Sequence, residues 1–344
     1  MTNDKLLITS NILNTGIFKL NFAPRLKNPY LKHIMSEQKY KIGILGVGAV
    51  GGFYGAKLAS HYASSNEVEI TFIARGENAK AIQANGLKLI TAGGEVVAHP
   101  ALVTSNPEEI GTIDILICAV KSYNLETSLE PLRGHINQNT VILPLQNGID
   151  AKERIQKLFP DTEVWEGCVY IVSRLTAPGV IQVTETNNLL HFGSEHGNKN
   201  RLEHVHTLLK DAGINVNLSN NIAQKMWEKF LFISPLATIT SYADQTVGFI
   251  VKNHQLITLF QSLLDELSSI SYALNIQLPD DIKAKIITRI NSLSPEITTS
   301  MHSDFQKHSP TELDTLTGYV VRLGEKLDIP TPTYNEMYTK LLNQ

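Results

Sequence analysis

Short apolar runs alternate with longer segments of mixed polarity through the first part of the chain. Near-continuous apolar runs such as 113–120 are typical of parallel strands that are covered on both faces. Strands that alternate with helices in this way predict an α/β fold with a parallel sheet. We expect a strand from Lys41, further strands at 68–74, 113–120, 141–145, 163–172, 179–184, 188–192 and 214–218, a hairpin at 86–97, and helices at 50–62 and 199–212.

The remainder of the chain carries helical patterns. Asn, Ser or Pro stands at the start of several of these segments, as is usual at helix N-termini. The predicted architecture is a Rossmann-type parallel-sheet domain, residues 39–219, followed by an all-α domain, residues 220–344, with a cleft between them. The candidate helices span 221–234, 253–274, 279–293, 295–308, 310–327 and 333–342.

The first 34 residues do not share these patterns. They hold one acidic residue, Asp4, against five lysines and arginines, and show no strand or helix period. Met35-Ser36-Glu37-Gln38 then leads into the first strand. We hypothesise that Met35 is the natural initiator and that residues 1–38 are an extension outside the fold, not native or disordered. A targeting peptide is the alternative, although no compact apolar segment with a cleavage site accompanies it.

Composition and charge narrow the class of partner. The 344 residues suffice for two domains with separate cores, and 42% hydrophobic against 18% charged residues is ordinary for a globular protein. The net charge is −3 and the basic residues are scattered, so we expect no binding to nucleic acid or to a membrane. The uncharged stretch 230–243 is too short and too polar to span a bilayer. A cytoplasmic location is expected, and the sequence allows a homodimer without requiring one.

The two cysteines, Cys118 and Cys168, both stand in apolar strand-like contexts. We expect them to be small buried side chains in a reducing compartment. No C-x-x-C or H-x-x-x-H pair indicates a metal site.

A glycine-rich turn follows the first strand. Gly46, Gly48 and Gly51 have the G-x-G-x-x-G spacing that lets backbone approach a dinucleotide pyrophosphate at a helix N-terminus. Three glycines alone are weak evidence, but the strand before them and the helix after them are the context that the motif requires. We therefore predict cofactor contacts from Gly46, Val47, Gly48, Ala49, Val50 and Gly51.

The ends of three further strands carry polar residues. Arg75 follows the second strand, where NAD-binding proteins usually place an acidic residue, and an arginine there can accommodate the 2′-phosphate of NADP. Lys121 and Asn147 follow the strands that end near 120 and 145. Asn147 can be a turn residue, because Asn-Gly favours positive φ, or it can face a nicotinamide. Since these strand ends share one edge of the sheet, we predict that they belong to a cofactor site.

Two charged residues of the helical region have competing interpretations. On a helical wheel Lys229 falls 20° from Ile222 and 40° from Ile233, inside an apolar sector. A lysine there must extend to solvent, pair with a carboxylate, or have a lowered pKa. Glu312 completes a capping box with Ser309 and Pro310, and spacing alone favours this structural role over a catalytic one.

The sequence from Lys41 to about Met337 resembles the ketopantoate reductase (2-dehydropantoate 2-reductase) family over both predicted domains. Each matching segment is short, but their order and spacing are specific. The segments are 46–51, Ala119-Val120-Lys121, Gln146-Asn147-Gly148, Trp227-Glu228-Lys229-Phe230, Ser300-Met301, and Thr311-Glu312-Leu313-Asp314 with Gly318-Tyr319 beyond.

The resemblance implies a role for each matching residue. Lys229 would be the general acid that protonates a ketone oxygen, and it would also contact substrate. Glu312 would contact the cofactor NADP(H) and help to orient Lys229. Lys121 and Asn147 would line the junction of cofactor and substrate, Ser173 would contact cofactor through its backbone, and Ser300 would bind the substrate carboxylate.

The sequence departs from the family pattern where the substrate would be recognised. The family places asparagines one and two turns beyond the lysine, where this chain has Ile233 and Ala237, and Val247 stands near a third such position. Losing hydrogen-bond partners of a substrate can change discrimination by orders of magnitude. A more apolar 2-oxo acid is the resulting hypothesis.

The sequence therefore predicts an NADPH-dependent reductase that converts a 2-oxo acid to a 2-hydroxy acid, with 2-dehydropantoate as the first candidate. A related reductase for another branched 2-oxo acid and a different two-domain dehydrogenase are the enzymatic alternatives. An NADP(H)-binding regulator without turnover is a third, although such a module has no need for a lysine on an apolar face.

Overall fold

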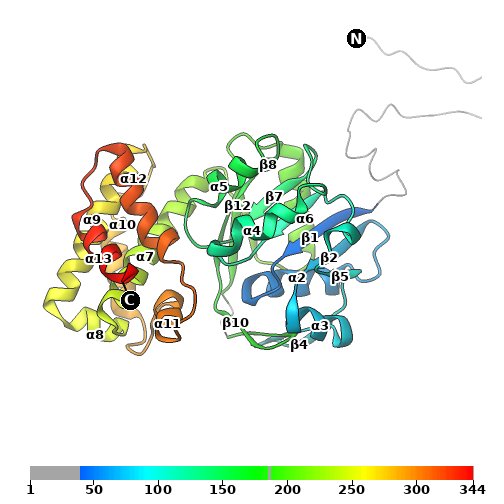
Figure 1. Ribbon diagram of the computed structural model, residues 1–344, viewed down its shortest axis with the longest axis horizontal. Helices are drawn as coiled ribbons and strands as arrows, with labels where there is room; N and C mark the ends of the chain where they lie inside the picture. Colours follow the sequence, from blue (N-terminus) through cyan, green and yellow to red (C-terminus); the bar gives the residue numbers. More distant parts are fainter. Residues whose placement is uncertain (1–38, 185–186, 344) are drawn as a thin grey trace, which may run out of the picture. The chain divides into compact units, whose positions relative to one another are not determined.

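The computed structural model describes residues 39–184 and 187–343. The expectations for residues 1–38 lie outside the described residues. Strands β1 to β13 and the helices between them come first, and helices α7 to α13 follow (Figure 1). The predicted fold class, a Rossmann-type parallel sheet followed by a helical region, is confirmed. We call these two stretches the strand-rich part and the helical part.

A six-stranded parallel sheet forms the centre of the strand-rich part. Its order is β5-β2-β1-β6-β7-β8, and each neighbouring pair is parallel. The order reverses between β1 and β6, and open α/β sheets bind ligands at the carboxyl ends of strands beside such a reversal. The strands are β1 (Tyr40–Leu45), β2 (Val68–Ile73), β5 (Leu102–Thr104), β6 (Ile115–Cys118), β7 (Val141–Pro144) and β8 (Glu163–Val164).

The apolar runs of this sheet supply two cores, one on each face. Successive residues of β1, Ile44 and Leu45, enter different apolar clusters, as do Ile117 and Cys118 of β6. All four are at most 4% exposed, because the strands are covered on both sides. The covering helices and short helical turns are α2 (Ala49–His61), α3 (Gly76–Asn85), η1 (Pro107–Glu109), η2 (Ser122–Asn124), α4 (Leu125–Leu129), η3 (Glu130–Leu132), α5 (Ala151–Leu158) and α6 (Lys199–Asp211).

Two smaller sheets complete the strand-rich part, with orders β10-β11-β3-β4 and β13-β12-β9. The expectation of one strand over 163–172 was wrong. The fully buried Trp165 separates β8 from β9, which pairs with β12 in another sheet, and a further strand, β10, begins at Ser173. The strands are β3 (Leu87–Thr91), β4 (Gly94–Ala98), β9 (Glu166–Tyr170), β10 (Ser173–Ala177), β11 (Val180–Val183), β12 (Leu189–Gly193) and β13 (Val216–Leu218).

The helical part has its own apolar core, to which its helices contribute. The helix expected over 221–234 does not stop before Pro235 but continues to Ala243. A proline inside a helix removes one backbone hydrogen bond, but residues 234–241 are all buried, and their packing outweighs that loss. The elements are α7 (Ile222–Ala243), α8 (Val247–Lys252), α9 (His254–Ala273), α10 (Ile282–Ser292), α11 (Ser300–Gln306), the π-helical turn η4 (Asp314–Gly318), α12 (Tyr319–Leu327) and α13 (Pro332–Leu342).

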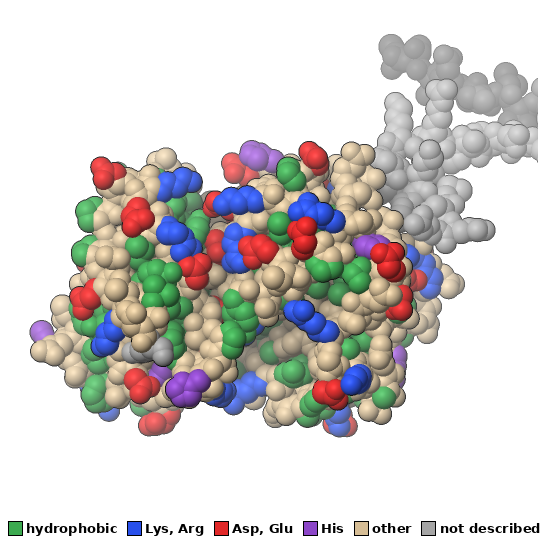
Figure 2. All heavy atoms as spheres, viewed as in Figure 1, with side chains coloured by type: hydrophobic (Ala, Val, Ile, Leu, Met, Phe, Trp, Pro, Cys, Tyr) green, Lys and Arg blue, Asp and Glu red, His purple; other side chains and the backbone are tan. Residues whose placement is uncertain are grey.

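Charges of both signs are interspersed over the face of the molecule that Figure 2 presents. Many of them belong to local ion pairs, such as Arg133 with Glu130 and Lys157 with Glu153. Surface pairs of this kind contribute little to stability, about 0–1 kcal/mol each. They do not assemble a basic field on that face.

Candidate active site

The glycine loop between β1 and α2 requires glycine at two of its three positions. Gly46 has a φ of +87°, and a Cβ there would lie 2.6 Å from Cγ1 of Val120. A Cβ on Gly51 would overlap the carbonyl oxygen of Gly46. Gly48 differs, since a Cβ there would have no heavy atom within 4 Å. The outer glycines therefore close the turn, while the middle one faces open space that a ligand can approach.

The N-terminus of α2 lies at this loop. Gly48 is the N-cap residue, and it has no side chain that could accept from the first N–H groups of the helix. Such groups, together with the helix dipole, favour an anion. Asn78 of α3 supports the loop, because its Nδ2 donates to the carbonyl oxygen of Val47 at 2.7 Å. The open approach at Gly48 and the uncapped helix start thus fit the pyrophosphate of a dinucleotide.

A cavity of about 250 Å³ opens beside the glycine loop. Its lining includes Gly46, Gly48 and Arg75, the exposed residue that follows β2 by two positions. Nη2 of Arg75 lies 3.5 Å from the hydroxyl of Ser128, which also lines the cavity. Among the described residues no carboxylate pairs with this guanidinium. Its charge is therefore available to an anionic group in the cavity.

Three of the predicted residues form a chain of hydrogen bonds between the two parts. Nζ of Lys229 on α7 donates to Oδ1 of Asn147 at 2.9 Å, and Nδ2 of Asn147 lies 3.4 Å from Oε2 of Glu312. Glu312 is 4% exposed, and its Oε1 accepts from the backbone N–H of Ser122 at 3.2 Å. The buried carboxylate therefore receives hydrogen bonds from two segments of the strand-rich part and lies in one chain with the lysine.

The capping box expected at Ser309 to Glu312 was wrong. The π-helical turn η4 begins at Asp314, and the N–H of Leu313 approaches the hydroxyl of Thr311 at 3.4 Å instead. Glu312 does not cap its own helix, because Ser122 and Asn147 supply donors for its carboxylate across the molecule. Tertiary hydrogen bonds thus replace the local ones that the sequence pattern predicts.

Lys121 lies just beyond the carboxyl end of β6, and its side chain reaches the helical part. Its Nζ lies 3.0 Å from Oδ2 of Asp304 on α11 and 4.0 Å from Oε2 of Glu312. Burial opposes its charge, but Glu312 and Asp304 together raise the pKa of Lys121 above its ordinary value. Sequence reasoning missed Asp304, although its position four residues after Ser300 places both on one helix face.

Lys229 is held in a partly buried setting. Its Nζ lies 5.9 Å from the centre of the Tyr170 ring, on β9. Burial lowers the pKa of Lys229 below the ordinary lysine value, while the Cys168 thiol and Glu312 act in the opposite direction. A lysine whose pKa moves toward neutrality is better suited to exchange a proton with a bound molecule.

The remaining predicted residues lie outside this chain of hydrogen bonds. Ser300 is the exposed first residue of α11, and Ser173 is the half-buried first residue of β10. Ile233, one turn beyond Lys229, is half-buried, and Ala237 is 3% exposed within the core of the helical part. The helix therefore presents no polar side chain at the two positions beyond the lysine.

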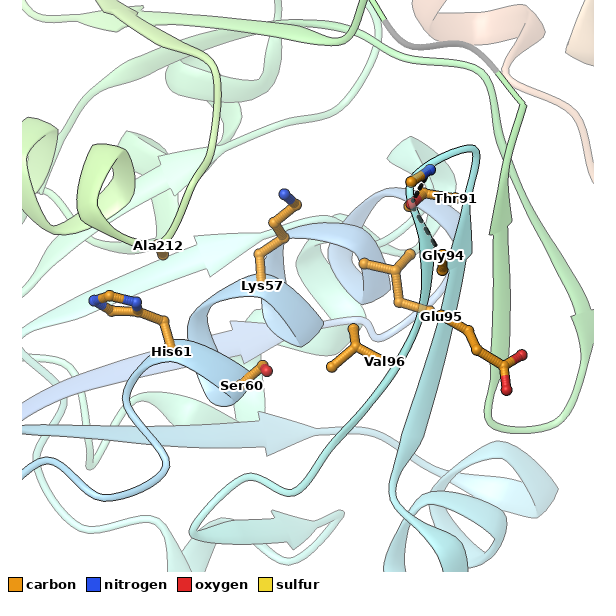
Figure 3. A pocket seen from close by; sticks show the side chains of 10 residues that line it. Lys57, Ser60, His61, Thr91, Gly94, Glu95, Val96 and Ala212 are labelled. Carbon is orange, nitrogen blue, oxygen red and sulfur yellow. Dashed lines mark hydrogen bonds between the residues drawn. The ribbon is translucent and has the colours of Figure 1, made fainter.

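A second cavity, of about 340 Å³, contains none of the predicted residues. Lys57 and His61 of α2 lie on one side of it, and the β3–β4 hairpin lies on the other, with Val96 directed toward α2 and the Glu95 carboxylate directed away (Figure 3). Nζ of Lys57 donates to the carbonyl oxygen of Gly213 at 3.1 Å. This lysine already has a partner, so we place the chemistry at Lys229 instead.

Residues 39–184 and 187–343 lack two kinds of feature. In that part of the chain no helix is both long and apolar enough to cross a bilayer. No cluster of three His, Cys, Asp or Glu side chains there is arranged to hold a metal ion. Both cysteines are buried and unpaired.

Comparison with known proteins identifies the family. Residues 42–196 match the family described as ketopantoate reductase PanE/ApbA, and residues 221–344 match its C-terminal counterpart. A 2-dehydropantoate 2-reductase of Mesorhizobium japonicum is 28% identical over 85% of this chain and 94% of its own. The oxidoreductase YkpB of Bacillus subtilis is 26% identical over 88% and 97%.

Solved structures support the same assignment. A 2-dehydropantoate 2-reductase from Porphyromonas gingivalis W83 is 37% identical, with a TM-score of 0.77 over 89% of this chain and all of its own. D-mandelate dehydrogenase, solved with NADH and anilino(oxo)acetate, shares the fold at 22% identity and a TM-score of 0.77, over 88% and 97%. The two family matches together span most of the chain, so the protein belongs to the ketopantoate reductase family and is a nicotinamide-dependent oxidoreductase that acts on a CH–OH group.

Proposed function

We propose that the protein reduces a 2-oxo acid to a 2-hydroxy acid with NADPH, and that 2-dehydropantoate is the first candidate substrate. The observation that carries this proposal is the partly buried Lys229, hydrogen-bonded to Asn147 at 2.9 Å and linked through it to Glu312. The same parallel sheet also carries the glycine loop that fits a dinucleotide. A cation with a lowered pKa therefore lies in a protein built to bind a hydride donor.

Lys229 supplies the proton in this proposal. Reduction of a ketone builds negative charge on its oxygen, and an ammonium group directed at that oxygen stabilises the transition state and then protonates the alkoxide. Asn147 accepts one hydrogen bond from the lysine and so restricts its direction. Glu312 holds the Asn147 amide and lies close enough to favour the charged lysine electrostatically.

NADPH is the proposed cofactor, and it supplies the hydride when bound. The loop 46–51 would hold its pyrophosphate at the start of α2, and Arg75 would pair with the 2′-phosphate. Support comes from the exposed, carboxylate-free guanidinium of Arg75 on the same cavity as the glycine loop. Lys121, Asn147, Ser173 and Glu312 are the further cofactor contacts that we propose.

Asn147, Lys229 and Ser300 are the proposed substrate contacts. The half-buried Ile233 and the buried Ala237 favour a second candidate, a branched 2-oxo acid with a more apolar side chain than that of 2-dehydropantoate. An apolar face beyond the lysine leaves a substrate hydroxyl without a partner, which disfavours a hydroxylated substrate.

Oxidation of NADPH, followed at its absorbance maximum, tests the proposal with a panel of 2-oxo acids that includes 2-dehydropantoate. We expect turnover of at least one of them, a higher kcat/KM with NADPH than with NADH, and a loss of about 10²–10⁴-fold in Lys229→Ala. Ile233→Asn should shift preference toward 2-dehydropantoate if the apolar position selects substrate.

Two results would contradict the proposal. Binding of NADPH without turnover of any 2-oxo acid would favour a regulator over an enzyme. Turnover that Lys229→Ala leaves unchanged would remove the lysine from the mechanism. Lys225→Ala, on the same helix and paired with Glu228 at 2.8 Å, is the matched control and should retain activity.

A further inference from the structure

Arg289 of α10 has an unusual setting for an arginine of this protein. Its guanidinium carbon lies 4.1 Å from the centre of the Phe232 ring, and 6.0 Å from the centre of the Tyr170 ring. Within the described residues it makes no hydrogen bond or ion pair. By contrast, four other arginines pair with carboxylates, namely Arg133, Arg154, Arg201 and Arg322.

The Tyr170 ring relates Arg289 to the proposed catalytic lysine. Nζ of Lys229 lies 5.9 Å from the centre of that ring, and Arg289 lies 6.0 Å from the same point. The two cations are therefore at most about 12 Å apart. Tyr170 belongs to the strand-rich part and Arg289 to the helical part, so the guanidinium lies where the two parts meet beside Lys229.

The charge balance of the site leaves a role for this cation. A 2-oxo acid brings a carboxylate into a partly buried region, and a buried anion is costly unless a cation and hydrogen bonds compensate it. Lys121 is already paired with Asp304, and Lys229 is assigned to the ketone oxygen. Ser300 can donate a hydrogen bond but carries no charge. Arg289 supplies the charge that these residues leave lacking.

Its stacked geometry suits the task. A guanidinium that stacks on an aromatic ring keeps its N–H groups in the plane of the group, where they can donate in parallel to both oxygens of a carboxylate. Phe232 neighbours Ile233 on α7, so an apolar surface continues from the arginine toward the side-chain end of a bound substrate.

We propose that Arg289 binds the carboxylate of the 2-oxo acid and that Phe232 and Tyr170 hold the guanidinium in place. The inference rests on the proposed function. It adds a requirement, namely that substrates carry a free carboxylate next to the ketone. A carboxylate and a ketone on adjacent carbons can reach both cations only if these lie on one small site, as the shared Tyr170 ring indicates.

Steady-state kinetics of Arg289→Gln with the best 2-oxo acid of the panel and with its methyl ester test this inference. We expect the KM of the acid to rise about 10–100-fold, the range for losing hydrogen bonds to a charged group. The KM of the ester should change less than about threefold, since the ester has no negative charge for the arginine to pair with. Arg289→Lys keeps the charge without the paired donors and should fall between.

Three measurements separate the outcomes. Fluorescence titration with NADPH should give the same Kd for wild type and Arg289→Gln. Lys283→Gln, on another face of α10 and paired with Asp265 at 2.7 Å, should leave both KM values unchanged. Equal losses with acid and ester, or an unchanged KM for the acid, would overturn the role of Arg289 while leaving the reductase intact. Absence of any wild-type turnover would overturn the reductase itself.

Discussion

Lys229 shows how one residue acquires chemistry from its surroundings. Its ammonium group is partly buried near an aromatic ring and a thiol, and its hydrogen bond is to a neutral amide oxygen rather than to a carboxylate. Burial disfavours the charged form more than the amide and the more distant Glu312 restore it, so the pKa is lowered. The lysine is thus able to give up a proton more easily than a surface lysine.

The pH dependence of the reaction should report this shift. Ketone reduction needs the protonated lysine, so kcat/KM should be constant at low pH and fall as pH rises through the lowered pKa, below the ordinary value of 10.5. The reverse oxidation needs the neutral amine and should rise over the same range. A fall that begins only near 10.5, or one that Glu312→Gln does not move further downward, would contradict the electrostatic account.

The sequence predicted part of this arrangement and could not predict the rest. The helical wheel placed Lys229 in an apolar sector, and burial in the structure agrees with that pattern. Its partner Asn147 is 82 positions away in sequence, so spacing could not join them, and the resemblance to a family supplied the pairing. Arg289 and Asp304 were not predicted, because an arginine or aspartate on a polar helix face reads as ordinary solvent exposure.

At the scale of elements, the turn after β7 and the π-helical turn η4 form a close junction. Gly148 has a φ of +94°, and a Cβ there would overlap the methyl group of Thr315 on η4. The turn carries Asn147, and η4 follows Glu312 by two positions. π-Helical turns are frequent at functional sites, and here one brings a backbone into contact with the turn that holds the amide.

Gly148→Ala should therefore damage both stability and turnover. The positive φ and the overlap together should lower the free energy of unfolding by about 1–3 kcal/mol, and displacement of Asn147 should lower kcat more than KM for cofactor. Chemical denaturation and steady-state kinetics measure the two effects. Thr315→Ser removes the overlapping methyl and should recover part of the loss.

Gly134→Ala is the control, since Gly134 is exposed and a Cβ there meets no heavy atom within 4 Å. Equal effects of the two glycine substitutions would show that the junction has no special role.

The same scale shows where sequence patterns mislead. Apolar runs predicted most strands, because a strand covered on both faces has few polar positions to interrupt the run. Pro235 and the capping box at Ser309 gave wrong helix ends, because burial of 234–241 and the buried hydrogen bonds of Glu312 outweigh local signals. Local patterns failed where the chain makes its long-range contacts.

At the scale of the whole molecule, the ion pair of Lys121 and Asp304 connects the strand-rich and helical parts. Side-chain exposures of 43% and 22% place it near solvent, where such a pair adds little to stability. Its effect on the site is more direct. Oε2 of Glu312 lies 4.0 Å from Nζ of Lys121 and 3.4 Å from Nδ2 of Asn147, so both groups address one oxygen. Asp304 keeps Lys121 from competing fully for it.

Asp304→Asn should separate these two effects. Lys121 should move toward Glu312, weaken its contact with Asn147, and lower kcat/KM by about 3–10-fold, equivalent to about 1 kcal/mol. The free energy of unfolding should change by less than about 1 kcal/mol. Asp265→Asn breaks an ion pair within the helical part, with Lys283 at 2.7 Å, and should leave kinetics unchanged.

A double-mutant cycle decides whether Asp304 acts through Lys121. If it does, Asp304→Asn has no further effect on kcat/KM in a Lys121→Met background, because the competing cation is gone. A full additional loss in that background would mean that Asp304 acts on its own helix and on Ser300 instead. The unfolding free energies of all four proteins provide the reference, since a purely structural role would move them in parallel with activity.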